Sequence, residues 1–218
     1  MPIRRTNRTN QKLWLKKNQH LKILDLGCSP MNYWKEANHF ADIEDHRDHF
    51  KSLNLNYTFF KPNEKLPFKD KEFDYVILSH VLEHVPEPFN LKKEIERIGK
   101  AGYIELPTKL NDNMVFGCDE EITGHKWWFE FDDDNNKLVF AKKIDALEKF
   151  ISVGSVFKLM SIFDDSLTLQ LYWHDNIPLE ERKPYTIEKK ITFNSLVRKF
   201  IGKKIRIYLS KLKKIFRK

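Results

Sequence analysis

Two histidines and a glutamate stand close together in FDYVILSHVLEHVPEPF, residues 73–89. His80, Glu83 and His84 form the string H-x-x-E-H, which in inverted metalloproteases supplies zinc ligands and a glutamate base from one helix. Here an apolar, strand-like run leads directly into His80, and two prolines follow His84 within four residues, so at most a single turn fits. A zinc site would also need a further ligand. The histidines that could supply it are His46, His49, His125 and His174. We therefore interpret the H-x-x-E-H match as accidental and expect no metal site.

The composition is that of a folded domain. At 218 residues the chain can bury a sizeable core. Hydrophobic residues make up 41% and charged residues 32%, a balance typical of globular proteins. No apolar run approaches the roughly 18 residues of a membrane span, and no apolar stretch follows the charged N-terminus as in a signal peptide. Cys28 and Cys118 are too few for a disulfide framework. We expect a cytoplasmic protein.

Positive charge is concentrated at the C-terminus. Residues 187–218 contain 12 Lys or Arg against one acid, Glu188, a net charge of +11. The remaining residues carry 27 basic against 30 acidic side chains, a net charge of −3. An inference about anionic partners therefore belongs to the last segment and not to the body of the protein.

Short apolar runs alternate with helical patterns over the first half of the chain. Between the last two runs, residues 89–98 place Leu91, Ile95 and Ile98 on one helical face, after Pro88 at a helix start. Apolar strands separated by helices predict a doubly wound, mainly parallel sheet, with ligands beyond the carboxyl ends of its strands. The expected strands are residues 22–26, 39–43, 56–60, 73–79 and 101–106.

The pattern changes after residue 110. Residues 126–131 and 137–142 flank a polar, turn-forming link, which predicts an antiparallel hairpin at the edge or roof of the sheet. Residues 167–173 alternate between apolar and polar and predict a further strand.

The first expected strand ends in ILDLGCSP, residues 23–30. Gly27 allows a tight turn and a close approach of the backbone to a ligand. Alone, this motif is weak, because Ser29 and Met31 stand where a G-x-G-x-G pattern would have glycine. An ordered set of features follows it downstream: Asp42 at the end of the second strand, residues 66–68 after the third, and the H-x-x-E-H run at the end of the fourth.

That ordered set resembles the class I S-adenosylmethionine-dependent methyltransferases, particularly small bacterial enzymes whose fourth strand reads FDxVxxSHVLEHV. GYIELPTKL, residues 102–110, is similar to the fifth strand and the loop after it. GHKW, residues 124–127, before a hairpin that continues to Phe140, is also similar. The resemblance covers roughly residues 20–142. It implies an α/β, Rossmann-like methyltransferase sheet with an added β-hairpin, and S-adenosyl-L-methionine as cofactor.

The resemblance also implies roles for the matching residues. Asp25, Gly27 and Ser29 would contact the methionine half of the cofactor. Asp42 would accept hydrogen bonds from the ribose hydroxyls, since a carboxylate offers two acceptors to a diol; Asp45 is its rival. The apolar side chain of Leu66 would pack near adenine. Ser79 and His80, at the end of the fourth strand, would lie over the reacting centre. The expected cofactor-binding residues are Asp25, Gly27, Ser29, Asp42, Asn63, Leu66 and Ser79.

Two departures from the family pattern define an alternative. Pro62 stands where relatives place an acid for the adenine amino group, and Asn63 would have to substitute through its side-chain carbonyl. Glycines are also missing from the first loop. The alternative is a catalytically inactive binding module that keeps the methyltransferase fold.

Methyl transfer from a sulfonium needs the acceptor held near the methyl group and in line with it. A hydroxyl acceptor also benefits from a general base. The candidate catalytic residues His80, His84, His125 and Glu105 all fall at or beyond expected strand ends. Each has a structural alternative: Glu83 and His84 could cap the next helix, Glu105 could face solvent, and His125 could support the tryptophans that follow it.

The expected acceptor is a small molecule or a glycan, lipid-linked glycans included, with oxygen as the methylated atom. An RNA methyltransferase is the alternative, because Ser29-Pro30 followed by Tyr33-Trp34 resembles the loop of ribosomal-RNA ribose methyltransferases. However, the fourth strand does not match theirs, and the body carries a slight negative charge.

The last segment predicts an amphipathic helix. Its apolar residues recur at helical spacing, opposed by basic side chains, which is typical of a helix lying in a membrane interface. We expect a methyltransferase domain over residues 1–186, with an N-terminal helix, and a basic tail over 187–218 that associates peripherally with the inner face of a membrane. The alternatives are a helix packed on the core and nucleic-acid binding. The apolar stripe consists of Val197, Ile201, Ile205, Tyr208, Leu212 and Ile215, widened by Leu209 and Phe216.

Overall fold

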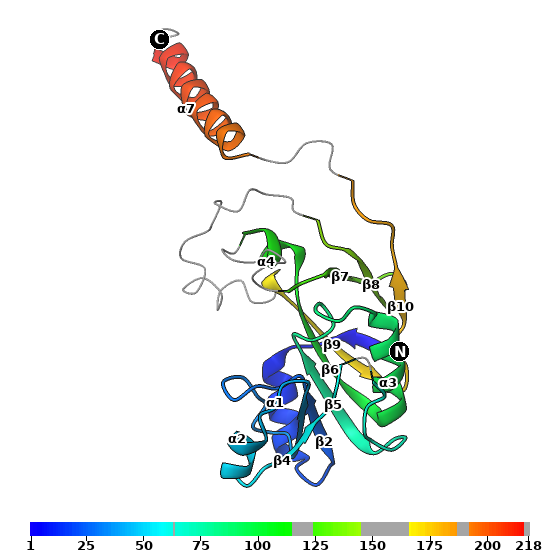
Figure 1. The fold of residues 1–218 in the computed structure, drawn as a ribbon. Helices are drawn as coiled ribbons and strands as arrows, with labels where there is room; N and C mark the ends of the chain where they lie inside the picture. Colours follow the sequence, from blue (N-terminus) through cyan, green and yellow to red (C-terminus); the bar gives the residue numbers. More distant parts are fainter. Residues whose placement is uncertain (63, 115–123, 145–165, 187–191, 216–218) are drawn as a thin grey trace.

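The computed structural model describes the chain except for residues 63, 115–123, 145–165, 187–191 and 216–218, which Figure 1 draws as a thin grey trace. A seven-stranded sheet forms its centre, with the strand order β4-β3-β2-β5-β6-β9-β1. These strands are β1 (Ile3–Arg5), β2 (Ile23–Leu26), β3 (His39–Asp42), β4 (Asn56–Phe59), β5 (Phe73–Ser79), β6 (Gly99–Pro107) and β9 (Thr168–His174). The described helices are α1 (Arg8–Lys17), α2 (Arg47–Ser52), α3 (Pro88–Ile98), α4 (Lys109–Met114) and α7 (Phe193–Ile215).

The strand order makes the sheet doubly wound. The strands β4, β3, β2, β5 and β6 are parallel to one another. The chain moves outward from β2 in one direction and from β5 in the other, and β9 returns antiparallel between β6 and β1. The predicted mainly parallel sheet is confirmed. Its order reverses between β2 and β5, which is where open α/β sheets bind ligands beyond their carboxyl ends.

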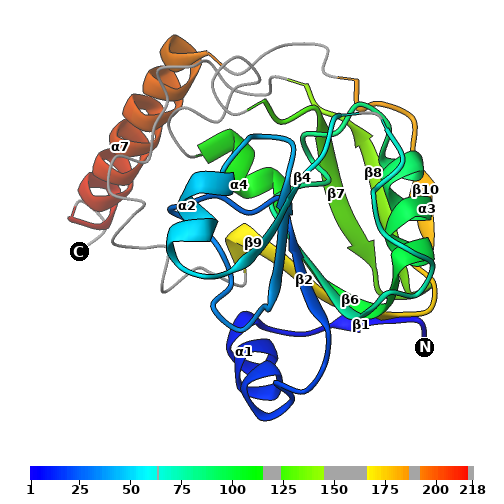
Figure 2. The same cartoon turned by 60° about the horizontal axis from the view of Figure 1, so that its bottom comes forward.

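Side chains that alternate along the strands build one core on each face of the sheet. Leu24 of β2 belongs to a core that also contains Ile95 of α3. Ile23, the residue before it, belongs to the opposite core with Leu15 of α1 and Phe50 of α2. Figure 2 shows α1 and α2 on one side of the sheet and α3 on the other. Burial on both faces explains why the strands read as apolar runs, each such side chain stabilising the fold by about 1.5–3 kcal/mol.

A second, three-stranded sheet covers part of the first. β7 (Trp127–Asp132) and β8 (Lys137–Lys142) pair antiparallel, so the predicted hairpin is confirmed. β10 (Leu179–Glu181) adds parallel to β8, which the sequence did not predict. Phe129 and Phe140 stack with ring centroids 5.6 Å apart and belong to the same core as α3. The hairpin therefore closes the face of the sheet that α3 covers.

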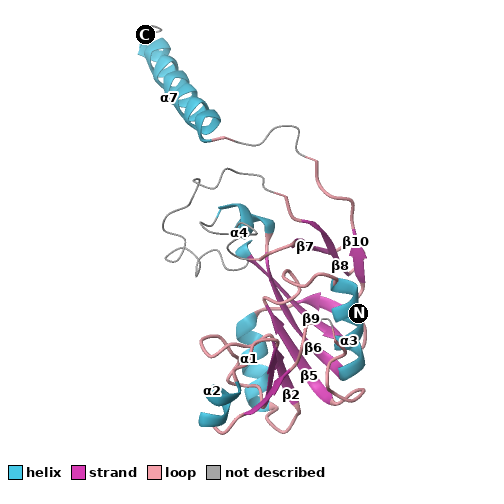
Figure 3. Cartoon of the chain, in the orientation of Figure 1, coloured by secondary structure: helices cyan, strands magenta, loops and turns pink. Residues whose placement is uncertain are grey.

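The C-terminal helix α7 confirms the predicted helix up to Ile215. Figure 3 shows it standing away from the sheet, so the alternative of a last helix packed on the core gains no support. Among the described helices, none has the length and apolar content needed to cross a membrane. The apolar side chains that α7 exposes are Val197, Phe200, Ile201, Ile205, Tyr208 and Leu209.

Candidate active site

The loop after β2 turns sharply where the strand order reverses. Gly27 has a φ of +84°, a conformation that favours glycine. A Cβ on Gly27 would lie 2.3 Å from Cγ2 of Val81, in the loop after β5. Two backbone hydrogen bonds between Ser29 and Asn32 then close a tight turn. Gly27 thus lets the loops after β2 and β5 approach each other closely at the expected ligand edge.

Asp25 holds this loop from within the sheet. Its side chain is buried, and its Oδ2 accepts a hydrogen bond from the backbone N–H of Trp34 at 2.7 Å. Burial raises the pKa of Asp25 to about 7, although the Trp34 hydrogen bond and the charge of Arg8 oppose the rise. Arg8 also lies over the Trp34 ring, with its Cζ 4.9 Å from the ring centroid. Asp25 therefore fixes the path of the loop from Gly27 to Trp34.

Asp42 ends β3 beside this turn. It is partly buried, and its Oδ1 accepts a hydrogen bond from the backbone N–H of Glu44 at 2.8 Å. Burial raises its pKa. Asp45, by contrast, is exposed and uses both carboxylate oxygens on the Arg47 guanidinium, at 2.8 Å and 2.5 Å. Because Arg47 occupies Asp45, Asp42 is the better-placed acceptor for a ligand beyond β3.

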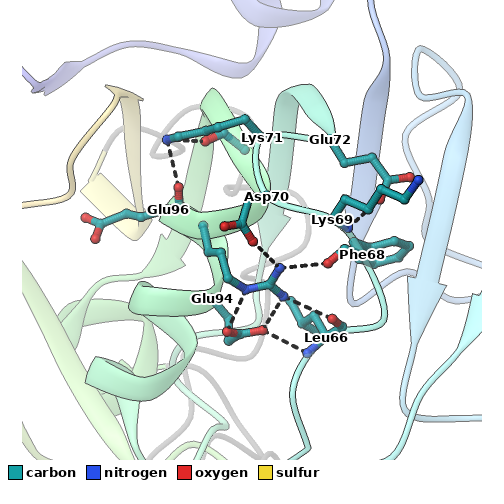
Figure 4. Close-up of polar contacts among 10 residues, drawn as sticks. Leu66, Phe68, Lys69, Asp70, Lys71, Glu72, Glu94 and Glu96 are labelled. Carbon is teal, nitrogen blue, oxygen red and sulfur yellow. Dashed lines mark hydrogen bonds and ion pairs between the residues drawn. The ribbon is translucent and has the colours of Figure 1, made fainter.

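Leu66, in the segment after β4, is buried and held through its backbone. Its N–H donates to Glu94 Oε2 at 2.8 Å, and its carbonyl accepts from Nη2 of Arg97 at 3.0 Å. Arg97 also binds Glu94 at 2.7 Å and the Phe68 carbonyl at 2.7 Å. Figure 4 shows Leu66, Phe68 and Glu94 close together in this segment. Helix α3 therefore clamps the segment that carries Leu66. Asn63, just before it, lies outside the described residues.

The chain leaves β5 through a tight backbone conformation and a single turn. Ser79 is buried, and its Oγ has no hydrogen-bond partner among the described residues. His80 has a φ of +59°. The N–H of His84 donates to the carbonyl of Val81 at 3.1 Å, and the next helix, α3, begins only at Pro88. The expectation that no sustained helix carries both histidines is confirmed.

His80 lies between two buried carboxylates. Its Nδ1 is 3.1 Å from Oε1 of Glu83, and its Nε2 is 3.4 Å from Oε1 of Glu105. The same Glu105 oxygen pairs with Nη1 of Arg8 at 2.9 Å, and Oε2 accepts from the Tyr103 hydroxyl at 2.6 Å. Basic and acidic side chains therefore alternate in space, from Arg8 in α1 through Glu105 in β6 to His80 and Glu83 in the loop after β5.

These contacts set the protonation states of His80 and Glu105. Burial opposes the charged form of His80, but its hydrogen bonds to Glu105 and Glu83 outweigh burial and raise its pKa to about 9. Burial also opposes the charge on Glu105, yet the His80 hydrogen bond and the Arg8 charge lower the Glu105 pKa. His80 is therefore a fixed cation at neutral pH. The alternative that Glu105 faces solvent is wrong, because only 4% of it is exposed.

His84 and His125 form a second group with Glu83. Their ring centroids are 4.7 Å apart, and His84 Nε2 lies 4.0 Å from Glu83 Oε1. His125 Nδ1 is 2.8 Å from Oδ1 of Asp112 in α4. Neither Glu83 nor His84 caps α3, whose N-cap is Glu87, so that alternative is wrong. His80 and His84 thus lie beyond the end of β5 and His125 just before β7, whereas Glu105 lies inside β6, two residues before its end.

Two residues of this arrangement were not predicted. Arg8 is 97 positions from Glu105 in the chain, and no spacing in the sequence connects them. Asp112 follows the fifth parallel strand without any motif of its own. The pairing of Tyr103 with Glu105 had a signal that could have been used, because residues two apart in a strand face the same side.

A family model described as a methyltransferase domain matches residues 24–104, the stretch from β2 to β6. No curated protein matches the chain. Over this stretch the chain is similar to the methyltransferase domain, and the matched residues form the parallel part of the doubly wound sheet.

Several solved structures are similar to this chain at low identity. A SAM-dependent methyltransferase from Aquifex aeolicus is 16% identical, with a TM-score of 0.39, over 77% of this chain and 93% of that one. One from Archaeoglobus fulgidus is 18% identical, with a TM-score of 0.38, over 77% and 94%. A putative methyltransferase from Haloferax volcanii, in complex with the Trm112 methyltransferase activator, is 13% identical, with a TM-score of 0.44, over 77% and 92%. The family model and the strand order, and not these alignments, carry the assignment.

The described residues at this edge fit the cofactor of the class. The turn from Gly27 to Ser29 brings backbone to the carboxyl end of β2. Asp42 places a partly buried carboxylate one strand away, and Ser79 adds a buried hydroxyl with no partner among the described residues. These are groups that would hold the polar parts of S-adenosylmethionine, which supplies an activated methyl group when bound.

Proposed function

We propose that this protein transfers a methyl group from S-adenosylmethionine to an oxygen of a small molecule or a glycan. The observation that carries the proposal is the convergence of Asp25, Asp42 and His80 on one edge of a sheet whose residues match the methyltransferase domain. Asp25 and the turn from Gly27 to Ser29 receive the methionine half of the cofactor, Asp42 the ribose, and Leu66 the adenine.

The loop after β5 shapes the acceptor side. His80 is held between Glu83 and Glu105, so its ring keeps one orientation beside the reacting centre. Such positioning matters because in-line transfer depends mainly on holding the acceptor near the methyl group. His84 and His125 border the same space. Because His80 is a cation at neutral pH and cannot take a proton, His84 or His125 serves as the base for a hydroxyl acceptor.

The charge distribution favours a small or sugar acceptor over RNA. The body of the protein carries a net charge of −3, whereas binding of a nucleic acid relies on neutralising its phosphates with Lys and Arg. The basic residues are gathered in the tail, where α7 also exposes apolar side chains. We infer that the protein acts in the cytoplasm and that α7 lies on the anionic inner face of a membrane, close to lipid-linked acceptors.

The test is methyl transfer from S-adenosylmethionine carrying a labelled methyl group, supplied to the whole protein together with metabolite or glycan pools. We expect label in a small-molecule or glycan fraction. Label recovered in RNA alone would replace the proposed acceptor with the RNA alternative. Cofactor binding without transfer to any pool would support the inactive binding module.

A further inference from the structure

The cluster of Glu83, His84 and His125 has the donor set of a metal site. Two imidazoles and one carboxylate are ligands that zinc takes in catalytic sites, where a fourth position stays open. The three residues come from two segments: Glu83 and His84 from the turn after β5, and His125 from the residues just before β7. The hydrogen bond from the Lys126 N–H to the Glu83 carbonyl, at 2.8 Å, holds these segments together.

The distances between the donor atoms suit a single ion. One nitrogen or oxygen from each of the three side chains lies within 4.8 Å of the other two. An ion with bonds of about 2.1 Å needs ligand atoms roughly 3.4 Å apart, so the atoms that are furthest apart would have to approach by up to about 1.4 Å. Rotation of the His84 ring, which is 40% exposed, can supply part of that movement.

The cluster also has the outer partners that orient metal ligands. Asp112 is buried, and its Oδ1 lies 2.8 Å from Nδ1 of His125, which directs the other nitrogen of that ring away from Asp112. His80 in the same way binds Oε1 of Glu83 at 3.1 Å. A carboxylate behind a ligating histidine and a donor on a ligating carboxylate are typical of protein metal sites.

Glu83 itself is the second observation that indicates a ligand. Its side chain is fully buried, and its Oε2 has no hydrogen-bond partner within the described part of the chain. An unpartnered carboxylate oxygen is costly to bury. A cation held by Glu83 would remove that cost.

We propose that Glu83, His84 and His125 bind one divalent transition-metal ion of the zinc type. The sequence argument against a metal concerned His80 and His84 sharing one helix. The structure instead combines His84 with His125, 41 residues further along the chain. The ion would pin the turn after β5 to the start of β7 beside the acceptor space. The proposal does not depend on methyl transfer.

The test uses the whole protein, stripped with a chelator and titrated calorimetrically with Zn²⁺ alone. We expect one ion per chain. His84→Ala and Glu83→Gln should each weaken binding at least tenfold, and Asp112→Asn by about 10–100-fold as the loss of an outer partner. The matched control is His174→Ala, because this exposed histidine pairs with Asp175 far along the sheet and should leave zinc binding unchanged.

Circular dichroism of each stripped variant separates loss of the site from loss of the fold. If buried Glu83→Gln does not fold, the partly exposed His84→Ala decides the matter. Absence of zinc uptake by the unsubstituted protein would overturn the proposal. So would tight uptake that survives His84→Ala, since the ion would then be held by other histidines.

Discussion

Asp42 offers the sharpest single-residue test of cofactor recognition. Replacing Asp42 with Ala should remove two charge-assisted hydrogen bonds to the ribose, each contributing about 1.5–3 kcal/mol. We expect the dissociation constant for S-adenosylmethionine to rise at least tenfold, measured by calorimetry, with the folded state retained. Asp45→Ala is the matched control, because Arg47 already occupies that carboxylate. An unchanged constant for Asp42→Ala combined with a weaker one for Asp45→Ala would exchange their roles.

Asp25 makes stability depend on pH. Its pKa is about 7 in the folded protein, against an ordinary value of 3.8. Because the folded-state pKa is raised, the favourable contribution is present at low pH and is lost as the pH rises through about 7. The Asp25→Asn side chain does not ionise, so this variant does not lose stability in this way as the pH rises. Without cofactor, the free energy of unfolding of this variant relative to wild type should grow between pH 5 and about pH 7 by at most about 3 kcal/mol, at ~1.36 kcal/mol per pH unit, and should then level off towards pH 8. Denaturation curves that keep a constant difference across this range would contradict the assignment.

The residue types of the site were only partly readable from the sequence. Asp25, Gly27 and Asp42 could be found because each lies in, at the end of or directly after a short apolar strand. Arg8 and Asp112 could not, since their contacts with Glu105 and His125 depend on how distant segments pack. Glu83, His84 and His125 were each named from the sequence, but their clustering could not be predicted, for the same reason.

The loop after β5 is the element on which turnover should depend. We expect alanine at one or more of His80, His84 and His125 to lower turnover by about 100-fold, the low end for a lost general base, while cofactor affinity survives. His80 has a positive φ, so His80→Asn, which tolerates that conformation, accompanies His80→Ala. Normal turnover of all these variants with the true acceptor would place the acceptor site elsewhere.

Among the elements, the apolar strands of the parallel sheet were predictable, and the three-residue edge strands β1 and β10 were not. β5 and β6 are buried on both faces, which leaves a continuous apolar run in the sequence. β1 and β10 have three residues each and expose most of them, so neither has a readable period. They form because β9 and β8 present edges to them, a property of the assembled sheets.

For the molecule as a whole, α7 predicts attachment to lipid. Its exposed apolar residues and basic neighbours should bind an anionic bilayer, at roughly 1 kcal/mol per Lys or Arg near the surface. We expect the full chain to sediment with anionic vesicles in a salt-sensitive manner and a chain ending at Thr186 to stay in the supernatant. Neutral vesicles are the control. If both chains sediment with the vesicles to the same extent, or neither does, the tail is not the part that binds lipid.

The most direct test of the central claim is calorimetric titration of the full chain with S-adenosylmethionine. The geometry at the carboxyl ends of β2, β3 and β5 predicts saturable binding with one cofactor per chain. The absence of further glycines from the loop after β2 and the presence of Pro62 act against tight binding of the cofactor. The segment that carries Leu66 favours binding, because Glu94 and Arg97 hold it in place. Absence of any binding at millimolar cofactor would contradict the assignment of this edge as a methyl-donor site.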